Sequence, residues 1–266
     1  MIGAIAGDVI GSVHERGPPQ AKNFPLFVPG SKFTDDTVLT IAVASAIREG
    51  SDFGAAIRQW GRRYPNAGYG KMFRNWLSDG DAGPYNSFGN GSAMRVAAVG
   101  WAFDDLDVVL RKSAESAEVT HNHPEGIKGA QAVAVAVLLA RKGGTKEQIA
   151  GWLSERFGYD CSTDLAVLQS QGKFDVTCQG TVPAAAVAFL RSTDFEDAIR
   201  NAVSFGGDAD TLACIAGAMA EAYYGSVPAE IRAEVLRRLD DPIRAELTAF
   251  ASRYGIPLSD RLDADD

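Results

Sequence analysis

Apolar residues recur at helical spacing along most of the chain, whereas the alternating pattern of a β-strand is scarce. In segments 38–45 and 212–220 they follow one another at intervals of three and four, which marks one face of a helix. The pattern therefore predicts an all-α protein with a single domain. Further helices are expected at 52–63, 106–118, 125–141, 145–157, 181–191, 194–204, 229–239 and 242–254.

Small residues are dense in these segments, which predicts close packing of helix on helix. Gly3, Gly7 and Gly11 repeat at every fourth position of the first segment and would form a smooth stripe there. Asp8 lies within the same apolar segment. Because a buried acid needs a partner, we expect Asp8 to orient a neighbouring element.

Two stretches depart from the helical pattern. Residues 14–33 contain four prolines and little periodicity, and loops of this length in compact domains are usually functional or disordered. This loop leads into an acidic cluster, so a lid or rim is expected. The acidic residues 259–266 are interpreted as a solvated tail, which leaves 1–258 as the folded domain.

Two short clusters, 33–37 and 206–211, each place two aspartates and a threonine within four positions at the start of a helical segment. Threonine and aspartate are also common helix caps, so each cluster alone is open to that interpretation. Residues 145–148 and 193–196 show what ordinary capping boxes look like in this chain. The two clusters do not match that pattern, and their shared, unusual composition favours a joint metal site.

If the fold brings both clusters together, their four carboxylates repel one another by roughly 4 kcal/mol per pair at 4 Å and an effective dielectric constant of 20. A cation would relieve this repulsion. Oxygen ligands without a nearby histidine or cysteine pair suit Mg²⁺ or Mn²⁺. Because one Mg²⁺ seldom takes four carboxylates, we expect two ions that share bridging groups.

A glycine-rich turn at residues 87–91 directly precedes another apolar helical segment. Exposed backbone N–H groups at such a helix start form a phosphate or diphosphate site, although glycines also simply permit turns. Within this turn, Phe88 could stack on a base or pack in the core. Both interpretations remain open from the residues alone.

Three further polar residues are candidates for the same site. His121 and His123 lie within three positions of each other at a helix start set by Pro124. His121 is the better candidate for a ligand contact, with an ordinary surface histidine as the alternative. Glu15 begins the long loop and is either a general base, a metal-linked carboxylate or an exposed loop acid.

Charge and cysteine usage narrow the class of protein. A net charge of −8, a pI near 5.0 and the lack of any Lys/Arg run argue against a nucleic-acid partner. Apolar stretches such as 130–140 are too short to cross a bilayer. Three widely spaced cysteines without a CxxC pair suggest neither a disulfide framework nor a zinc–thiolate site. We expect a soluble, monomeric protein of the reducing cytoplasm.

Taken in order, the motifs of this chain resemble those of the ADP-ribosylglycohydrolase family. The resemblance implies a compact orthogonal helical bundle with two Mg²⁺ or Mn²⁺ ions in a cleft. Some arginine-directed members carry an acid where Ser87 stands here, so this departure leaves arginine specificity open. The matching blocks are residues 3–15, 33–37, 89–95, 120–121 and 206–211, within a span of about residues 3 to 220.

The resemblance also assigns roles to individual residues. The metal ligands would be Thr34, Asp35, Asp36, Asp208, Asp210 and Thr211, with Glu15 beside the centre. The diphosphate and adenosyl parts of the substrate would be held by Ser87, Phe88, Gly89, Asn90, Gly91 and His121.

The implied reaction is hydrolysis of the bond between ADP-ribose and an acceptor, through an oxocarbenium-like transition state. The acceptor would be an arginine or serine side chain of a protein, or a small molecule. Glu15, or an aspartate of the centre such as Asp36 or Asp208, would take the proton of the attacking water. A two-metal phosphoesterase and a non-catalytic ADP-ribose-binding protein are the alternatives.

Overall fold

The computed structural model describes residues 1–258, and the expected tail at 259–266 lies outside this range. The described chain is all-α, as predicted; its only β-type pairings are two isolated bridges. No helix in residues 1–258 has both the length and the apolar character to span a bilayer. The helices are α1 (Ile2–Gly11), α2 (Asp35–Glu49), α3 (Phe53–Arg63), α4 (Lys71–Ser78), α5 (Gly91–Met94), α6 (Ala97–Ala102), α7 (Leu106–Glu118), α8 (Pro124–Arg141), α9 (Lys146–Phe157), α10 (Leu165–Gln171), α11 (Cys178–Leu190), α12 (Phe195–Ser204), α13 (Ala209–Tyr224), α14 (Ala229–Arg238) and α15 (Asp241–Tyr254).

The helices expected from periodicity are confirmed, mostly to within one residue at each end. The exception is α11, which begins three residues early because the Thr177 hydroxyl caps it by accepting from Gly180 N. Short helices were harder to recognise: α4, α6 and α10 each have eight residues or fewer. Periodicity cannot identify helices that span only about two turns.

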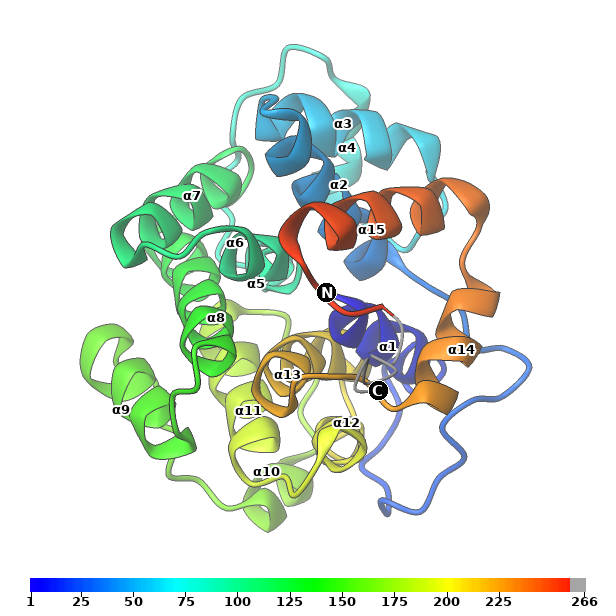
Figure 1. The fold of residues 1–266 in the computed structure, drawn as a ribbon, viewed down its shortest axis with the longest axis vertical. Coiled ribbons are helices and arrows are strands. Elements are labelled where there is room, and N and C mark those ends of the chain that lie inside the picture. The colour runs from blue at the N-terminus through cyan, green and yellow to red at the C-terminus, as the bar shows by residue number, and fades with distance from the viewer. Residues whose placement is uncertain (259–266) are drawn as a thin grey trace, which may run out of the picture.

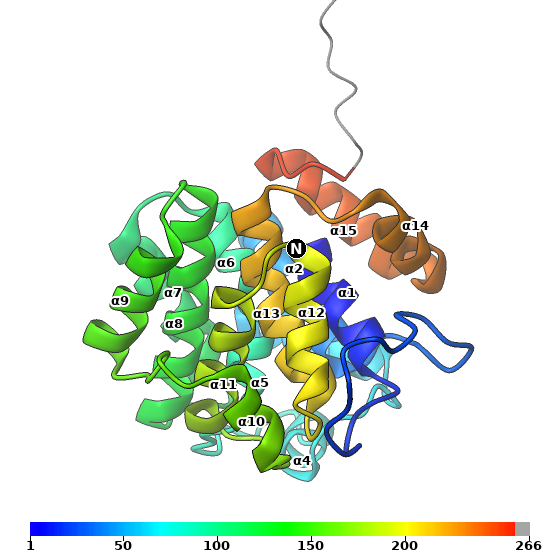
Figure 2. The ribbon, with the colours of Figure 1, turned by 90° about the horizontal axis from the view of Figure 1, so that it is seen from below.

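Helix α13 lies in the middle of the molecule, with α8 and α11 on one side and α1 on the other (Figures 1 and 2). Its contact with α1 is the most extensive in the fold. The glycine stripe explains this contact, because a Cβ on Gly7 would lie 2.0 Å from the Ala213 carbonyl oxygen. A Cβ on Gly11 would likewise lie 2.4 Å from Asp210 Cα. Only glycine allows the two backbones to approach so closely.

The long loop between α1 and α2 is confirmed, and it runs beside the second acidic cluster. Arg16 N donates to the Gly207 carbonyl at 2.6 Å, and Gly207 N donates to the Gly17 carbonyl at 3.0 Å. Gly206 and Gly207 both adopt positive φ angles, 71° and 70°, which glycine tolerates and other residues rarely do. The pair therefore makes the turn that places Asp208 next to the loop.

Of the two expected capping boxes, only the first is confirmed. Thr145 and Gln148 exchange the two reciprocal hydrogen bonds of a capping box at the start of α9. The prediction that Thr193 is the N-cap of α12 is wrong. Asp194 is the N-cap, and its carboxylate accepts from Asp197 N at 2.8 Å. The Asp197 side chain instead accepts from Thr193 N at 3.1 Å. The physical reason is that aspartate caps a helix better than threonine does.

Candidate active site

Both acidic clusters and the glycine-rich turn line one cavity of about 540 Å³, a size typical of small-molecule sites. Its walls come from the α1–α2 loop, the starts of α2 and α13, and the segments around residues 66–73, 85–95 and 174–176. The predicted site residues that line it are Glu15, Thr34, Asp35, Asp36, Ser87, Gly89, Asn90, Gly91, His121, Asp208, Asp210 and Thr211.

Phe88 is the predicted site residue that the structure does not bring into this cavity. Its side chain is 47% exposed, and its ring meets the edge of the His123 ring at a centroid distance of 5.4 Å. His123 has a structural role, because its Nδ1 accepts from Glu125 N as the N-cap of α8.

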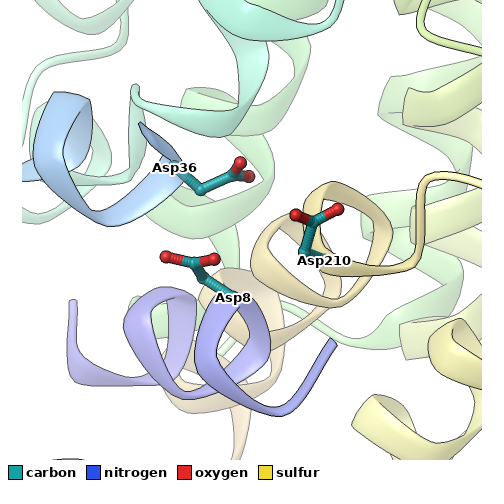
Figure 3. A group of neighbouring side chains, drawn as sticks. All are labelled: Asp8, Asp36 and Asp210. Carbon is teal, nitrogen blue, oxygen red and sulfur yellow. The ribbon is translucent and has the colours of Figure 1, made fainter. Parts of the chain in front are cut away.

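An acidic triad forms where α1, α2 and α13 meet, and two of its members, Asp36 and Asp210, line the cavity. Asp8, Asp36 and Asp210 each offer a carboxylate oxygen, and these three oxygens lie within 4.8 Å of one another. The side chains come from α1, α2 and α13 and point toward a common centre (Figure 3). All three are buried. The sequence interpretation underestimated Asp8, which was expected only to orient a neighbour.

Asp8 does orient its neighbour as well. It accepts from Thr34 N at 2.9 Å and from the Thr34 hydroxyl at 2.6 Å. It also accepts from Thr37 N at 3.0 Å and from the Thr37 hydroxyl. Because the Thr34 hydroxyl donates its hydrogen to Asp8 and accepts only one long hydrogen bond, from Asp36 N, its oxygen retains a lone pair for a cation. Asp8 therefore fixes the entire start of α2.

The second cluster does not act as an ordinary helix cap. Asp208 occupies the N-cap position of α13, yet its side chain makes no capping hydrogen bond. In the first cluster the Thr34 cap is present, but its hydrogen bond from Asp36 N is long, at 3.4 Å. Asp36 Oδ1 is buried and has no hydrogen-bond partner among the described residues. Buried carboxylate oxygens without donors fit a cation site.

The electrostatics of the cluster point the same way. Burial, followed by the charge of Asp8, raises the pKa of Asp36 far above its ordinary range. Burial and the charge of Asp208 do the same for Asp210. Burial also raises the pKa of Asp35 to about 8 and that of Asp208 to about 6. Such a cluster must be neutralised by protons or by bound cations at neutral pH.

The glycine-rich turn is tied to this cluster through one side chain. Asn90 Nδ2 donates to Asp208 Oδ2 at 2.5 Å and to Thr181 Oγ1 at 2.9 Å. The amide thus fixes one oxygen of the Asp208 carboxylate. This bond joins two motifs that are 118 residues apart.

The backbone of the turn is less available than expected. Gly89 N donates to Ser87 Oγ at 3.1 Å, and Asn90 N donates to the Val176 carbonyl at 2.8 Å. These two amides therefore cannot serve as free phosphate donors, contrary to the expectation from sequence. The cause is the segment before α11, which pairs with the turn through a bridge between Gly89 and Thr177.

Two side chains remain as donors beside the turn. The Ser87 hydroxyl accepts from Gly89 N, so its own hydrogen is free to donate. His121 Nε2 lies beside the turn, 3.2 Å from where a Cβ of Gly91 would stand and 3.5 Å from that of Gly89. Burial and the charge of Arg95 lower the pKa of His121 well below its ordinary range, so the ring is neutral.

Glu15 lies at the mouth of the cavity, on the α1–α2 loop. Its carboxylate accepts from Arg16 Nε at 3.3 Å, and its side chain is 38% exposed. The Arg16 guanidinium in turn lies 5.2 Å from the Phe174 ring centroid. Glu15 thus faces both solvent and the acidic cluster, a position open to water.

Sequence reasoning missed several lining residues. Tyr85 lines the cavity and places its ring 5.9 Å from that of His121. Phe174 and Val176 form part of the wall although they are more than 40% exposed. No local signal identifies these residues, because each reaches the site through a contact between distant segments.

The comparisons with known proteins agree with this geometry. The ADP-ribosylglycohydrolase family model matches residues 1–263. ADP-ribosylhydrolase ARH3 of Mus musculus is 26% identical over 85% of this chain and 82% of its own length. ADP-ribosylarginine hydrolase Tri1 of Pseudomonas putida (strain GB-1) is 27% identical over 85% of this chain and 69% of its own. A solved structure titled ADP-ribosylglycohydrolase-related protein complex aligns with a TM-score of 0.73 and 26% identity, covering 95% of each chain.

The all-α fold, the buried acidic residues beside the cavity and the family match together define the chain as a hydrolase of the ADP-ribosyl glycohydrolase class. It belongs to the ADP-ribosylglycohydrolase family, whose model covers nearly its whole length.

Proposed function

We propose that this enzyme hydrolyses the glycosidic bond between ADP-ribose and an acceptor, in a reaction that depends on Mg²⁺ or Mn²⁺. The observation that carries the proposal is that both acidic clusters, which contribute Asp36 and Asp210 of the triad, line one cavity with the side-chain donors beside the glycine-rich turn. A substrate that carries a diphosphate and a ribose would place its diphosphate beside the turn and its ribose beside the acidic clusters. The names of the relatives, which are ADP-ribosylhydrolases, support the same substrate class.

The acidic clusters fit two hard cations. Thr34, Asp35 and Asp36 from the first cluster and Asp208, Asp210 and Thr211 from the second would hold them. The unpartnered Asp36 Oδ1 and the raised pKa values of these aspartates support this assignment. When bound, the ions lower the pKa of water and polarise ribose hydroxyls.

The chain itself supplies binding and proton transfer. The Ser87 hydroxyl and His121 Nε2 face the position of the diphosphate beside the turn. Glu15 is the best-placed base for the attacking water, because it lines the same cavity as the acidic clusters and its side chain is partly exposed to solvent. Asp36 and Asp208 are the other candidates for this role. Holding the ribose rigidly favours the oxocarbenium-like transition state.

The acceptor side of the substrate would meet the cavity rim near Gly68 and Lys71, which line the same cavity. We propose a protein side chain, arginine or serine, as the acceptor. The name of the Pseudomonas putida relative specifies arginine. The chain carries Ser87 where some arginine-directed proteins carry an acid, so both linkages belong in the test.

The decisive assay offers arginine-linked and serine-linked ADP-ribosyl peptides, with Mg²⁺, Mn²⁺ or chelator, and identifies the products by mass. We expect free ADP-ribose in the presence of metal and none with chelator. Replacing Asp208 and Asp210 by alanine should abolish release, while the exposed control Glu118→Ala should retain it. AMP or inorganic phosphate as product would indicate a phosphoesterase, and tight ADP-ribose binding without turnover would indicate a binding protein.

A further inference from the structure

Arg95 is fully buried at the end of α5 and lies against the cavity wall. Its Nη2 donates to the Ser116 carbonyl at 2.7 Å and to Thr120 Oγ1 at 3.0 Å. Its Nε and Nη1 have no hydrogen-bond partner among residues 1–258. No carboxylate forms an ion pair with this guanidinium in the described chain. Burying an unpaired cation costs free energy. We therefore looked for a function of the hydrogen bond from Arg95 to Thr120, which leads toward the site.

That bond continues to the histidine of the site. Thr120 Oγ1 lies 2.7 Å from His121 Nδ1. A guanidinium can only donate, so Thr120 accepts from Arg95 and turns its own hydrogen away from the positive charge. A bare Nδ1 lone pair facing this side is favourable, whereas an Nδ1–H dipole would point its positive end toward the cation. The Thr120 hydrogen has two acceptors beside it, His121 Nδ1 and the Tyr85 hydroxyl. The positive charge of Arg95 favours the arrangement in which Nδ1 accepts and the ring proton lies on Nε2.

The proton on Nε2 matters because of what it faces. His121 Nε2 lies beside Gly89 and Gly91, where the amides of Gly89 and Asn90 already donate within the protein. An Nε2–H group donates to an anion at this point. The other tautomer would present a lone pair there and repel the same anion.

We propose that Arg95 and Thr120 are positioning residues that fix His121 as the neutral Nε2–H tautomer, which donates to the diphosphate of ADP-ribose. The identity of the anion rests on the proposed function, whereas the tautomer does not. Burial and the charge of Arg95 lower the pKa of His121, which keeps the ring neutral. In a neutral ring only one nitrogen carries a hydrogen, so the tautomer determines whether Nε2 can donate.

The test measures the tautomer directly by ¹⁵N NMR on the full-length protein, with the His121 signals assigned by their loss in His121→Gln. In wild type we expect protonated Nε2 and bare Nδ1. Thr120→Val keeps the side-chain shape but removes the hydroxyl, so both tautomers should appear. Thr120→Ser should restore the single tautomer. Tyr85→Phe is the matched control. The Tyr85 hydroxyl interacts with Thr120 in addition to Arg95 and His121, and its removal should leave the tautomer of His121 unchanged.

Calorimetric titration with ADP-ribose in Mg²⁺ gives the second readout. Thr120→Val should weaken binding about three- to tenfold, the effect of one hydrogen bond, and Thr120→Ser should recover it. Protonated Nδ1 in the wild type, or an unchanged tautomer in Thr120→Val, would overturn the positioning role even if the enzyme releases ADP-ribose. The expected tautomers with no ADP-ribose binding would uphold the positioning role and overturn the proposed ligand.

Discussion

The Asn90 amide donates to Asp208 Oδ2 at 2.5 Å and thereby joins the glycine-rich turn to the acidic cluster. The same amide is anchored by Thr181 on α11. Any displacement of the turn by a bound diphosphate is therefore transmitted to a carboxylate of the candidate metal centre. If the turn binds the diphosphate as proposed, one side chain links substrate binding to the acidic cluster.

Replacing Asn90 by alanine should reduce both Mg²⁺ affinity and ADP-ribose release by about 10- to 100-fold, the usual cost of losing a partner of a metal ligand. Calorimetry with Mg²⁺ and the product assay measure the two effects. Thr181→Val, which removes the acceptor that anchors the amide together with a hydrogen bond to the Asp175 carbonyl but leaves the bond from Asn90 to Asp208 in place, should have a smaller effect on both. Equal losses in the two variants would show that Asp208 does not depend on this bond.

Replacing Asp8 by asparagine should destabilise the fold by about 1 to 3 kcal/mol, because the amide oxygen can replace only Oδ2, the acceptor of Thr34 N and Thr37 N, and the new NH₂ group then faces the buried Thr34 hydroxyl, which loses its acceptor. Urea denaturation in chelator measures this loss without any contribution from metal. The matched control is Thr40→Val, one turn further along α2, which removes a hydroxyl that donates only to the Met94 carbonyl. If Asp8→Asn were no worse than this control, Asp8 would not organise the start of α2.

The metal-free protein should lose stability as pH rises. A carboxyl whose folded pKa exceeds its unfolded value binds its proton more tightly when folded, so its stabilising effect is complete below the unfolded pKa and is lost above it. For Asp35 and Asp208, which have ordinary values of 3.8, this window extends from about pH 4 to about 8 and about 6 respectively. Thermal melts in chelator at pH 5 and pH 8 should show the decrease.

Asp36→Asn gives the corresponding test by mutation. Replacing the carboxyl by a neutral amide should raise the melting temperature of the metal-free protein at pH 8 and reduce the decrease with pH, because the buried Asp36 carboxyl must hold a proton at a pH where the unfolded chain has lost it, and the amide carries no such cost. Added Mg²⁺ should stabilise the wild type by mass action but the variant much less. A wild type that melts at the same temperature with Mg²⁺ and with chelator would argue against a cation in this cluster.

The glycine stripe gives a prediction for stability alone. Gly7→Ala should cost about 1 to 3 kcal/mol or more, because its Cβ would meet the Ala213 backbone. Gly151→Ala is the control: it lies inside α9 with nothing within 4 Å of the added Cβ, so it should stabilise by up to about 1 kcal/mol. Urea denaturation of both variants measures the difference.

The sequence was most informative where the signal was local. Two aspartates and a threonine at each of two helix starts predicted the acidic site, because the residues that form each half are adjacent in the chain. Asp8 was harder to interpret, because a single acid in an apolar helix is equally consistent with a structural partner. The structure shows that it is both a partner of Thr34 and a member of the triad.

Pairings between distant segments could not be predicted. The bond from Asn90 N to the Val176 carbonyl joins segments 86 positions apart, and it removes an amide that the turn was expected to offer. The same contact brings Phe174 into the cavity wall. Periodicity and capping rules use only the residues of one segment, so they cannot predict which distant segment will pack against it.

The contact between α1 and α13 has a consequence for the acidic triad. Gly11 lies directly against Asp210 Cα, and Gly7 against Ala213, so the spacing between the Asp8 and Asp210 backbones is set by hard atomic contact. Side-chain rotation can adjust the coordination only slightly, and the helices cannot separate without losing their packing. The backbone spacing between these two carboxylates is therefore fixed by the main chain. Whatever neutralises them, a proton or a cation, has to fit that spacing, because the helices cannot move apart to accommodate it.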